Sequence, residues 1–219
     1  MTATRPTLLH IDSSPRGEAS LSRRLSGEYV ARWKRANSNG TILRRDLTTS
    51  ELPVLTAEWI GASFTPEASR APAQRELLRI SDTLIAELNA ANEYVIGLPM
   101  HNFTVAAALR LWIDQIVRVG KTFAYVDGLP SGLLRNKRTT FFITTGGVYT
   151  PGTSMAACDF AEPYLRTIFG FLGISETRFH IAGGAAAVTS GKMDAAAFLY
   201  PHLESIRHHF APALAVSAV

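Results

Sequence analysis

The turn with the widest choice of chemistry in this sequence is Pro99–Phe103, which reads PMHNF. It offers an imidazole, a thioether and an amide, and the amide of Asn102 can both donate and accept hydrogen bonds. A flat redox cofactor needs this mixture, because its faces require apolar packing and its polar edge requires hydrogen bonds. His101 is either a substrate contact or an exposed loop imidazole without chemistry, and its residue type leaves both open.

A second polar segment, His10–Ser22, reads HIDSSPRGEASLS and matches neither a P-loop nor the G-x-G-x-x-G pattern. What remains is a hydroxyl-rich loop before a helix, where free N–H groups and the helix dipole suit a phosphate dianion. The expected phosphate ligands are Ser13, Ser20 and Ser22, with Arg16 screening the charge. The alternative is that Ser20 only caps the helix, which serine does well without a ligand. The loop by itself does not separate these two interpretations.

A third segment, Thr144–Tyr149, reads TTGGVY and contains paired glycines. Such a pair permits positive φ and a close approach of the backbone to a ligand, although Gly-Gly is just as often an ordinary turn. Its position after a predicted strand gives it weight, because ligands of open α/β sheets bind beyond the carboxyl ends of the strands. The three loops together are typical of a mononucleotide flavin site, with the phosphate at the first loop and the ring at the other two.

Apolar runs alternate with helical patterns along the chain, which indicates a parallel sheet with helices on both faces. We predict strands at 7–12, 41–46, 93–98, 138–144 and 177–182, and helices at 20–36, 70–91, 104–119, 159–172 and 190–210. These elements favour a single α/β domain over residues 1–219. Its expected architecture is a flavodoxin-like three-layer sandwich with strand order 2-1-3-4-5.

Two segments, 47–70 and 121–135, are longer than this fold requires and carry aromatic residues. Long excursions of this kind are usually lids or partner contacts. We therefore expect them near the cofactor or at a subunit interface.

Composition narrows the possible classes. The chain has 219 residues, of which 47% are hydrophobic and 18% are charged. These values are typical of globular proteins. A bilayer span needs roughly 20 consecutive apolar residues. No apolar run approaches that length, and residues 1–6 lack the apolar core of a secretory signal, so we expect no membrane association and a cytoplasmic location.

The single cysteine, Cys158, excludes an internal disulfide and a multi-cysteine metal site. Its neighbours include no histidine or basic group that would lower the pKa of the thiol. We therefore expect a buried, inert thiol and no metal.

The net charge is +4, and a local basic excess lies on a predicted helix and the strand that follows it. Its members are Arg23, Arg24, Arg32, Lys34, Arg35, Arg44 and Arg45. Without a recognisable nucleic-acid module we interpret them as a solvated face or as steering for an anionic cofactor. A nucleic-acid-binding regulator is the third functional alternative, and salt-sensitive DNA binding would support it.

Taken in order, these segments resemble the FMN-dependent NADH azoreductase family, also described as NADH:quinone oxidoreductases of flavodoxin-like fold. The resemblance rests on Ser13-Ser14 with Ser20 and Ser22, Asp46-Leu47, Pro53–Leu55, Leu84–Leu88, Pro99–Phe103, Gly120–Tyr125, Gly146-Gly147, Pro163–Leu165, Phe169–Ile174 and Ala182–Gly184. An ordered series over nearly the whole chain is far more specific than any one motif.

The resemblance implies tightly bound, non-covalent FMN. Its expected contacts are Ser13, Ala19, Ser20, Leu21 and Ser22 for the phosphate, and Pro99, Met100, His101, Asn102, Phe103, Thr144, Thr145, Gly146 and Gly147 for the ring. It also implies a homodimer with active sites at the interface, where Trp59, Phe64, Phe123, Tyr125 and Tyr149 would contact substrate. The chain departs from the family at His101, where tyrosine is common, and at Thr145, where arginine is common.

The functional hypothesis is a ping-pong, two-electron transfer from NADH or NADPH through FMN to quinones or azo compounds. The protein supplies no nucleophile, because the cofactor carries the chemistry; His101 or Asn102 would orient the acceptor. The alternative is a flavodoxin-type electron carrier that acts on protein partners. Such carriers are commonly acidic, and the positive net charge speaks against this class.

Overall fold

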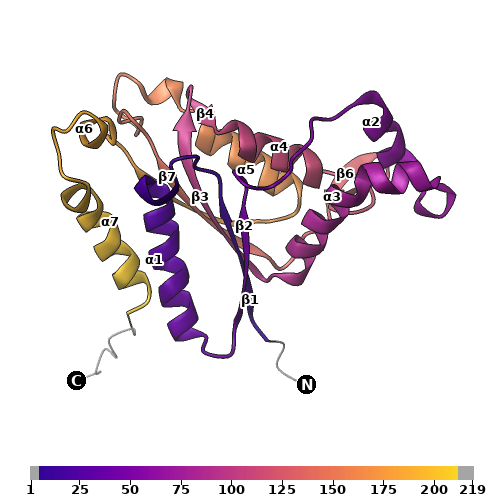
Figure 1. Ribbon diagram of the computed structural model, residues 1–219, viewed down its shortest axis with the longest axis horizontal. Helices are drawn as coiled ribbons and strands as arrows, with labels where there is room; N and C mark the ends of the chain where they lie inside the picture. The colour runs from indigo at the N-terminus through magenta and orange to yellow at the C-terminus, as the bar shows by residue number, and fades with distance from the viewer. Residues whose placement is uncertain (1–4, 212–219) are drawn as a thin grey trace.

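The computed structural model describes residues 5–211 of the chain (Figure 1). Residues 1–4, part of the segment that we inspected for a secretory signal, lie outside the described residues, as do residues 212–219. Within the described range, no helix has both the length and the apolar character needed to cross a membrane.

Five parallel strands form the central sheet in the order β2-β1-β3-β7-β8. They are β1 (Thr7–Asp12), β2 (Thr41–Asp46), β3 (Glu93–His101), β7 (Arg138–Thr144) and β8 (Glu176–Ala182). Counted along the chain as the five main strands, this order is 2-1-3-4-5, so the predicted flavodoxin-like fold is confirmed. The first six residues of β3 are all buried, as expected for a central strand with helices on both faces.

The helices cover the sheet in two layers (Figure 1). One face packs against α1 (Leu21–Ala36) and α7 (Ala195–His209), and the other against α3 (Pro72–Ala90), α4 (Ala107–Ile116) and α5 (Ala161–Phe171). Neighbouring residues of the strands alternate between the two cores: Val95 and Phe142 join the first, and Ile96 and Phe141 join the second. Alternation along each strand therefore explains why the same apolar runs feed both layers.

Two predicted helices have different bounds in the structure. Residues 104–105 form a short strand, β4 (Thr104–Val105), antiparallel to the end of β3, which makes β3 longer than predicted. The predicted helix 190–210 corresponds to α7, which begins only at Ala195, and a turn separates it from the short α6 (Ala186–Thr189), which the sequence did not predict. Gly191 takes a φ of 73° after α6, and Asp194 caps α7 by accepting from Ala196 N at 2.7 Å. The cap at Asp194 and the turn at Gly191 therefore set the start of α7, whereas α4 begins after β4 without a side-chain cap.

The two long excursions acquire short elements of their own. The first contains α2 (Ala57–Phe64), and the second forms a hairpin of β5 (Phe123–Val126) and β6 (Leu129–Gly132). Short 3-10 turns lie at Gly17–Ala19, Glu67–Ser69 and Ala156–Cys158. In Figure 1, α2 and β6 lie at the right-hand end of the molecule, and α6 and α7 at the other end.

Candidate active site

Three of the predicted loops meet at a pocket of about 210 Å³ beyond the carboxyl ends of β1, β3 and β7. Its walls combine hydroxyl groups with small or apolar side chains. The lining residues are Ser14, Arg16, Ser20, Leu21, Pro99, Met100, His101, Thr144, Thr145, Gly146, Ala185, Ala186 and Thr189. The sheet edge that the loop order predicts is therefore where a concave site forms.

The fourth wall of the pocket is the segment Ala185–Thr189, which contains α6. The sequence did not predict this wall. Two backbone hydrogen bonds join this segment to the loop after β7, Ala185 N to Thr145 O and Ala186 N to Gly146 O, and two more join the residues just before it, Thr145 N to Ala182 O and Gly184 N to Gly147 O. A helix of four residues is too short to leave a periodic pattern. The small residues Ala182–Gly184 were its only signal.

The first loop presents fewer of its serines than expected. Ser20 Oγ accepts from Arg23 N at 3.3 Å and lies 3.1 Å from Ser22 Oγ, so Ser20 does cap α1 while it also lines the pocket. Ser13 and Ser22 are buried and do not line the pocket; Ser13 Oγ donates to the Gly97 carbonyl at 3.3 Å. The donors that this loop offers the pocket are thus the hydroxyls of Ser14 and Ser20, the guanidinium of Arg16 and the first N–H groups of α1, which have no intrahelical carbonyl to bind.

Ala19 is exposed and lies outside the pocket lining. Leu21, the other expected contact of this loop, does line it.

The turn after β3 is a two-residue hairpin, with Asn102 at φ 48° and Phe103 at φ 69°. Pro99 and Met100 line the first pocket, whereas Asn102 and Phe103 do not. Asn102 lines a neighbouring pocket of about 370 Å³, together with Thr104, Val105, Ala107, Arg110 and Tyr164. His101 is the residue that lines both pockets.

The glycine pair works differently from the expectation. Neither Gly146 nor Gly147 takes a positive φ, whereas Gly17 in the first loop, Asn102 and Phe103 in the turn after β3, and Gly184 before α6 do. A Cβ at Gly146 would meet no atom nearer than the Ala186 Cβ at 4.0 Å, so the missing side chain leaves the pocket open. Gly147 lies beside Tyr149 and outside the pocket lining.

Thr145, one of the two departures from the resembled family, is buried. Its hydroxyl donates to the Gly147 carbonyl at 2.7 Å. The Thr145 side chain therefore stabilises the loop after β7, to which it belongs.

The aromatic residues expected at the substrate do not line either pocket in the part of the single chain that the structure describes. Trp59 is buried against Leu78 of α3 and Phe123 against Phe171 of α5, while Phe64 and Tyr125 are exposed. Tyr149 lies closest to the site by its contacts, because its ring meets that of Phe103 edge-on with 6.2 Å between centroids.

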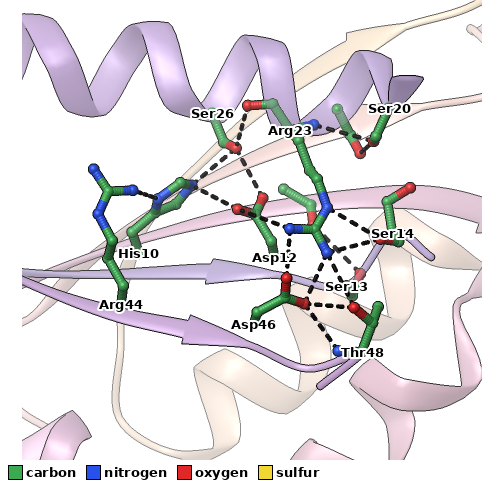
Figure 2. Close-up of polar contacts among 12 residues, drawn as sticks. His10, Asp12, Ser13, Ser14, Ser20, Arg23, Ser26, Arg44, Asp46 and Thr48 are labelled. Atoms are coloured by element: carbon green, nitrogen blue, oxygen red, sulfur yellow. Dashed lines mark hydrogen bonds and ion pairs between the residues drawn. The ribbon is translucent and has the colours of Figure 1, made fainter. Parts of the chain in front are cut away.

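A polar cluster lies beneath the first loop (Figure 2). Two nitrogens of Arg23 each lie 2.7 Å from an oxygen of Asp46, and its Nε and Nη2 donate to the Ser14 carbonyl at 3.0 and 2.8 Å. The hydrogen bonds from Arg23 lower the pKa of Asp46 to about 2, whereas burial raises the pKa of Asp12 to about 6. One carboxylate of the cluster is therefore firmly ionised, and the other titrates close to neutrality.

His10 continues this cluster on the far side of Asp12 (Figure 2). Arg44 Nη1 lies 3.0 Å from His10 Nδ1, and because arginine can only donate, Nδ1 accepts and the proton lies on Nε2. His10 Nε2 lies 3.0 Å from Ser26 Oγ, which lies 3.1 Å from Asp12 Oδ1. Burial, with Arg44 beside it, lowers the pKa of His10 to about 4, so the imidazole is neutral at pH 7.

Most of the basic excess noted in the sequence has partners in the structure. Besides Arg23 and Arg44, Arg32 binds Glu28, Arg45 binds Glu87, and Lys34 donates to two backbone carbonyls. Side chains engaged in this way favour a solvated face over a nucleic-acid surface.

Two other expectations concern cysteine and metal. Cys158 is partly exposed, so the expectation of a buried thiol was wrong: it ends a 3-10 turn rather than lying in a core element. Among residues 5–211, no group of three or more His, Cys, Asp or Glu side chains is arranged to hold a metal ion.

Comparison with known proteins gives consistent matches. Residues 6–203 match a protein family characterised by a flavodoxin-like fold. The chain is 48% identical over 201 residues to an FMN-dependent NADH:quinone oxidoreductase of Acidobacterium capsulatum, covering 92% of this chain and 97% of that protein. It is also 48% identical over 204 residues to FMN-dependent NADH:quinone oxidoreductase 3 of Burkholderia lata, covering 93% and 99%. Among solved structures, an azoreductase from Bacillus anthracis superposes with a TM-score of 0.83 at 25% identity, covering 94% of this chain and 98% of that chain.

Proposed function

This chain belongs to the family of FMN-dependent NADH:quinone oxidoreductases with a flavodoxin-like fold, and from that premise we propose how it works. It is an FMN-dependent oxidoreductase that carries two electrons from NADH or NADPH to quinones and azo compounds. The reaction follows a ping-pong order, in which the oxidised donor leaves before the acceptor binds. The observation that carries the proposal is the pocket formed by the loops after β1, β3 and β7.

The residues of this pocket fit FMN. Ser14, Ser20 and the N-terminus of α1 would hold the phosphate, with Arg16 at the rim, because hydroxyls and free amides at a helix N-terminus bind dianions. Pro99 and Met100 would pack on the ring, and the open space at Gly146 lets a planar group approach the backbone. When bound there, FMN supplies the redox chemistry.

The chain's own residues then orient the reactants. His101 lines both pockets, so its imidazole can contact a ring in the first pocket and an acceptor in the second. Asn102 offers the second pocket a donor and an acceptor from one side chain. Neither residue is needed as a nucleophile, and water can deliver the proton to the reduced acceptor.

The functional unit in this proposal is a homodimer. Exposed apolar side chains gather in the two excursions, which suggests a covered surface. They are Val54, Leu55, Ile60, Phe64, Tyr125, Val126 and Leu129. A second copy that covers them would bring aromatic residues to the first pocket, whose lining within residues 5–211 includes no phenylalanine, tyrosine or tryptophan. Light scattering on the purified protein tests this: Phe64→Glu and Leu129→Glu should shift a dimeric mass toward that of one chain, and a monomeric wild type would contradict it.

We place the reaction in the cytoplasm, in keeping with a chain whose single cysteine forms no internal disulfide. Fractionation of cells that express the full chain tests the location.

An absorption spectrum and a turnover assay test the function. Purified protein reconstituted with FMN should show the absorbance of bound flavin and oxidise NADH with a small quinone and no protein partner. Colourless protein without turnover would overturn the proposal. Bound flavin that reacts only with a partner protein would favour an electron carrier instead. Initial rates at several fixed acceptor concentrations should give the parallel double-reciprocal lines of a ping-pong order.

A further inference from the structure

Arg23 contacts both ends of the loop between β1 and α1, one end through its backbone N–H and the other through its side chain. The backbone N–H of Arg23 donates to Ser20 Oγ at 3.3 Å, and its guanidinium donates twice to the Ser14 carbonyl, at 3.0 and 2.8 Å (Figure 2). The intervening residues 15–19 are exposed and include only a three-residue 3-10 turn. Arg23 therefore fixes the span of a segment that has little packing of its own.

The Ser14 carbonyl is a group that a phosphate site must control. The next residue is Pro15, which has no N–H, so this peptide could offer a dianion only its carbonyl oxygen, and that oxygen would repel it. Two N–H groups of Arg23 hold the oxygen on the side where Asp46 lies. Without them, the carbonyl is free to rotate toward the pocket.

Arg23 acts by geometry more than by charge. Asp46 binds it through both carboxylate oxygens at 2.7 Å, and Asp12 lies 3.8 Å away, so two carboxylates face one guanidinium. The cluster is also tightly enclosed: a Cβ at Gly97 would lie 2.6 Å from Ser26 Oγ and 2.8 Å from Asp12 Oδ1. A guanidinium held in this way acts through the fixed geometry of its N–H donors, which orients the Ser14 carbonyl that they bind.

We propose that Arg23, held by Asp46, is a positioning residue for the cofactor phosphate, and that this pair sets the preference of the protein for FMN over riboflavin. The inference rests on the proposed function, because it takes the loop after β1 as the phosphate site. Arg23 does not line the pocket, and its side chain acts through the Ser14 carbonyl, while its backbone N–H, which every variant keeps, remains bonded to Ser20.

The test is a pair of titrations on flavin-free protein, in which quenching of flavin fluorescence gives the affinity for FMN and, separately, for riboflavin. Arg23→Gln should weaken FMN binding ~10-fold or more, since a hydrogen bond to a charged group is worth about that factor, and should change riboflavin binding by about twofold or less. Arg23→Lys should lose as much as Arg23→Gln, because an ammonium keeps the charge but not the fork. Arg32→Gln, on the same helix and paired with Glu28, is the matched control and should change neither affinity.

Asp46→Asn separates geometry from charge by the sign of its effect. It removes a negative charge close to the phosphate, so a purely electrostatic role of this pair predicts tighter FMN binding. The positioning role predicts weaker FMN binding, because Arg23 loses its bidentate partner. Tighter binding in Asp46→Asn, or full affinity in Arg23→Lys, would overturn the inference.

Riboflavin binding provides the remaining check. Equal losses for both flavins in Arg23→Gln would indicate general damage to the site and would also overturn the inference. If wild-type protein binds FMN and the variants keep that affinity, only this inference fails. If wild-type protein binds neither flavin, both the proposed function and this inference fail.

Discussion

Helix α1 carries two buried polar clusters, one near each end, and they differ in how completely their acids are paired. The loop cluster, under the loop after β1, consists of His10, Asp12, Arg23, Ser26 and Asp46. The base cluster, at the amino ends of β3 and β7, consists of Tyr29, Trp33, Glu93 and Arg138. Both place a carboxylate against α1 in the interior.

The base cluster surrounds its acid with donors. Glu93, 2% exposed, accepts from Tyr29 Oη at 2.8 Å, from Trp33 Nε1 at 3.0 Å and from Arg138 through two nitrogens. Burial, with Glu93 beside it, raises the pKa of Tyr29, so the phenol stays a donor. This cluster lies at the opposite end of the sheet from the candidate site, and its role is to hold α1 to the sheet.

The loop cluster is less completely paired and touches the site. Asp12 accepts a hydrogen bond from Ser26, and burial raises its pKa to about 6. Arg23 reaches from the cluster to the Ser14 carbonyl in the pocket wall. The contrast indicates that the amino end of the sheet is built for stability, while the carboxyl end retains an electrostatic cost where the cofactor would bind.

The largest expected effect comes from breaking the base cluster. Glu93→Ala leaves Tyr29 and Trp33 with buried donors and Arg138 without its partner, and should lower the free energy of unfolding by about 3–5 kcal/mol. Glu93→Gln keeps the shape and part of the acceptor set and should cost less. Urea unfolding measures both.

FMN affinity of the surviving folded protein is the control for this change. The affinity should stay within about twofold of wild type, because the base cluster lies at the opposite end of the sheet from the candidate site. A twofold change corresponds to only ~0.4 kcal/mol of binding free energy. A large loss of affinity in Glu93→Gln would show that the two ends of α1 are coupled and would remove the distinction between the clusters.

The next effect is a pH dependence that arises from Asp12 in the loop cluster. The pKa of Asp12 is about 6 in the folded chain against 3.8 in the unfolded one, so the folded state binds the extra proton between these values. The contribution of Asp12 to the free energy of unfolding is therefore fully present below pH 3.8 and is lost as pH rises through about 6. The loss amounts to about 3 kcal/mol. Asp12→Asn removes that cost, so its stability relative to wild type should rise by up to this amount between about pH 4 and about pH 7.5.

His10 contributes with the opposite sign, and because its Nε2 lies 3.4 Å from Asp12 Oδ2, the difference between the two proteins also contains the coupling of these two groups. The pKa of His10 falls to about 4, so His10 destabilises the folded chain as pH drops below the ordinary value of 6.5. Urea unfolding of both proteins at each pH gives the difference. A difference in the free energy of unfolding that stays constant across this pH range would mean that burial does not raise the pKa of Asp12.

These clusters also show where sequence interpretation stops. The sheet order and the three loops were predictable, because apolar runs such as Tyr94–Leu98 mark buried strands and the loops follow them directly. The bond from Arg23 to Asp46 was not, since the residues belong to different elements and neither type requires the other. The hairpin at Asn102-Phe103 was missed because two-residue turns with positive φ usually carry glycine at the second position. The wall at α6 was missed because four residues show no period.

The third test breaks the site at the carboxyl end without touching either cluster. A side chain at Gly146 would enter the pocket without backbone strain, because its φ is not positive and the nearest atom to a Cβ is 4.0 Å away. Gly146→Val should therefore leave unfolding nearly unchanged and weaken FMN binding by about 10-fold to 100-fold, as overpacking costs about 1–3 kcal/mol. Gly146→Ala should give a smaller loss in the same direction. Unchanged FMN affinity in both would place the ring elsewhere.

The smallest effect concerns strain stored at the site itself. Phe103 holds a φ of 69°, and its ring contacts Tyr149. The left-handed conformation costs a residue with a Cβ roughly 1–2 kcal/mol. Comparing two truncations isolates the backbone, because Phe103→Ala and Phe103→Gly both remove the ring and only the second removes the Cβ.

At an ordinary position glycine is less stable than alanine by about 0.5–1 kcal/mol. At position 103 the order should invert, with Phe103→Gly more stable than Phe103→Ala by about 1 kcal/mol in urea unfolding, because glycine adopts positive φ without a steric penalty. If Phe103→Ala is instead the more stable variant, the hairpin relaxes in solution and stores no backbone strain. The two ends of the sheet would then differ only in how their charged groups are paired.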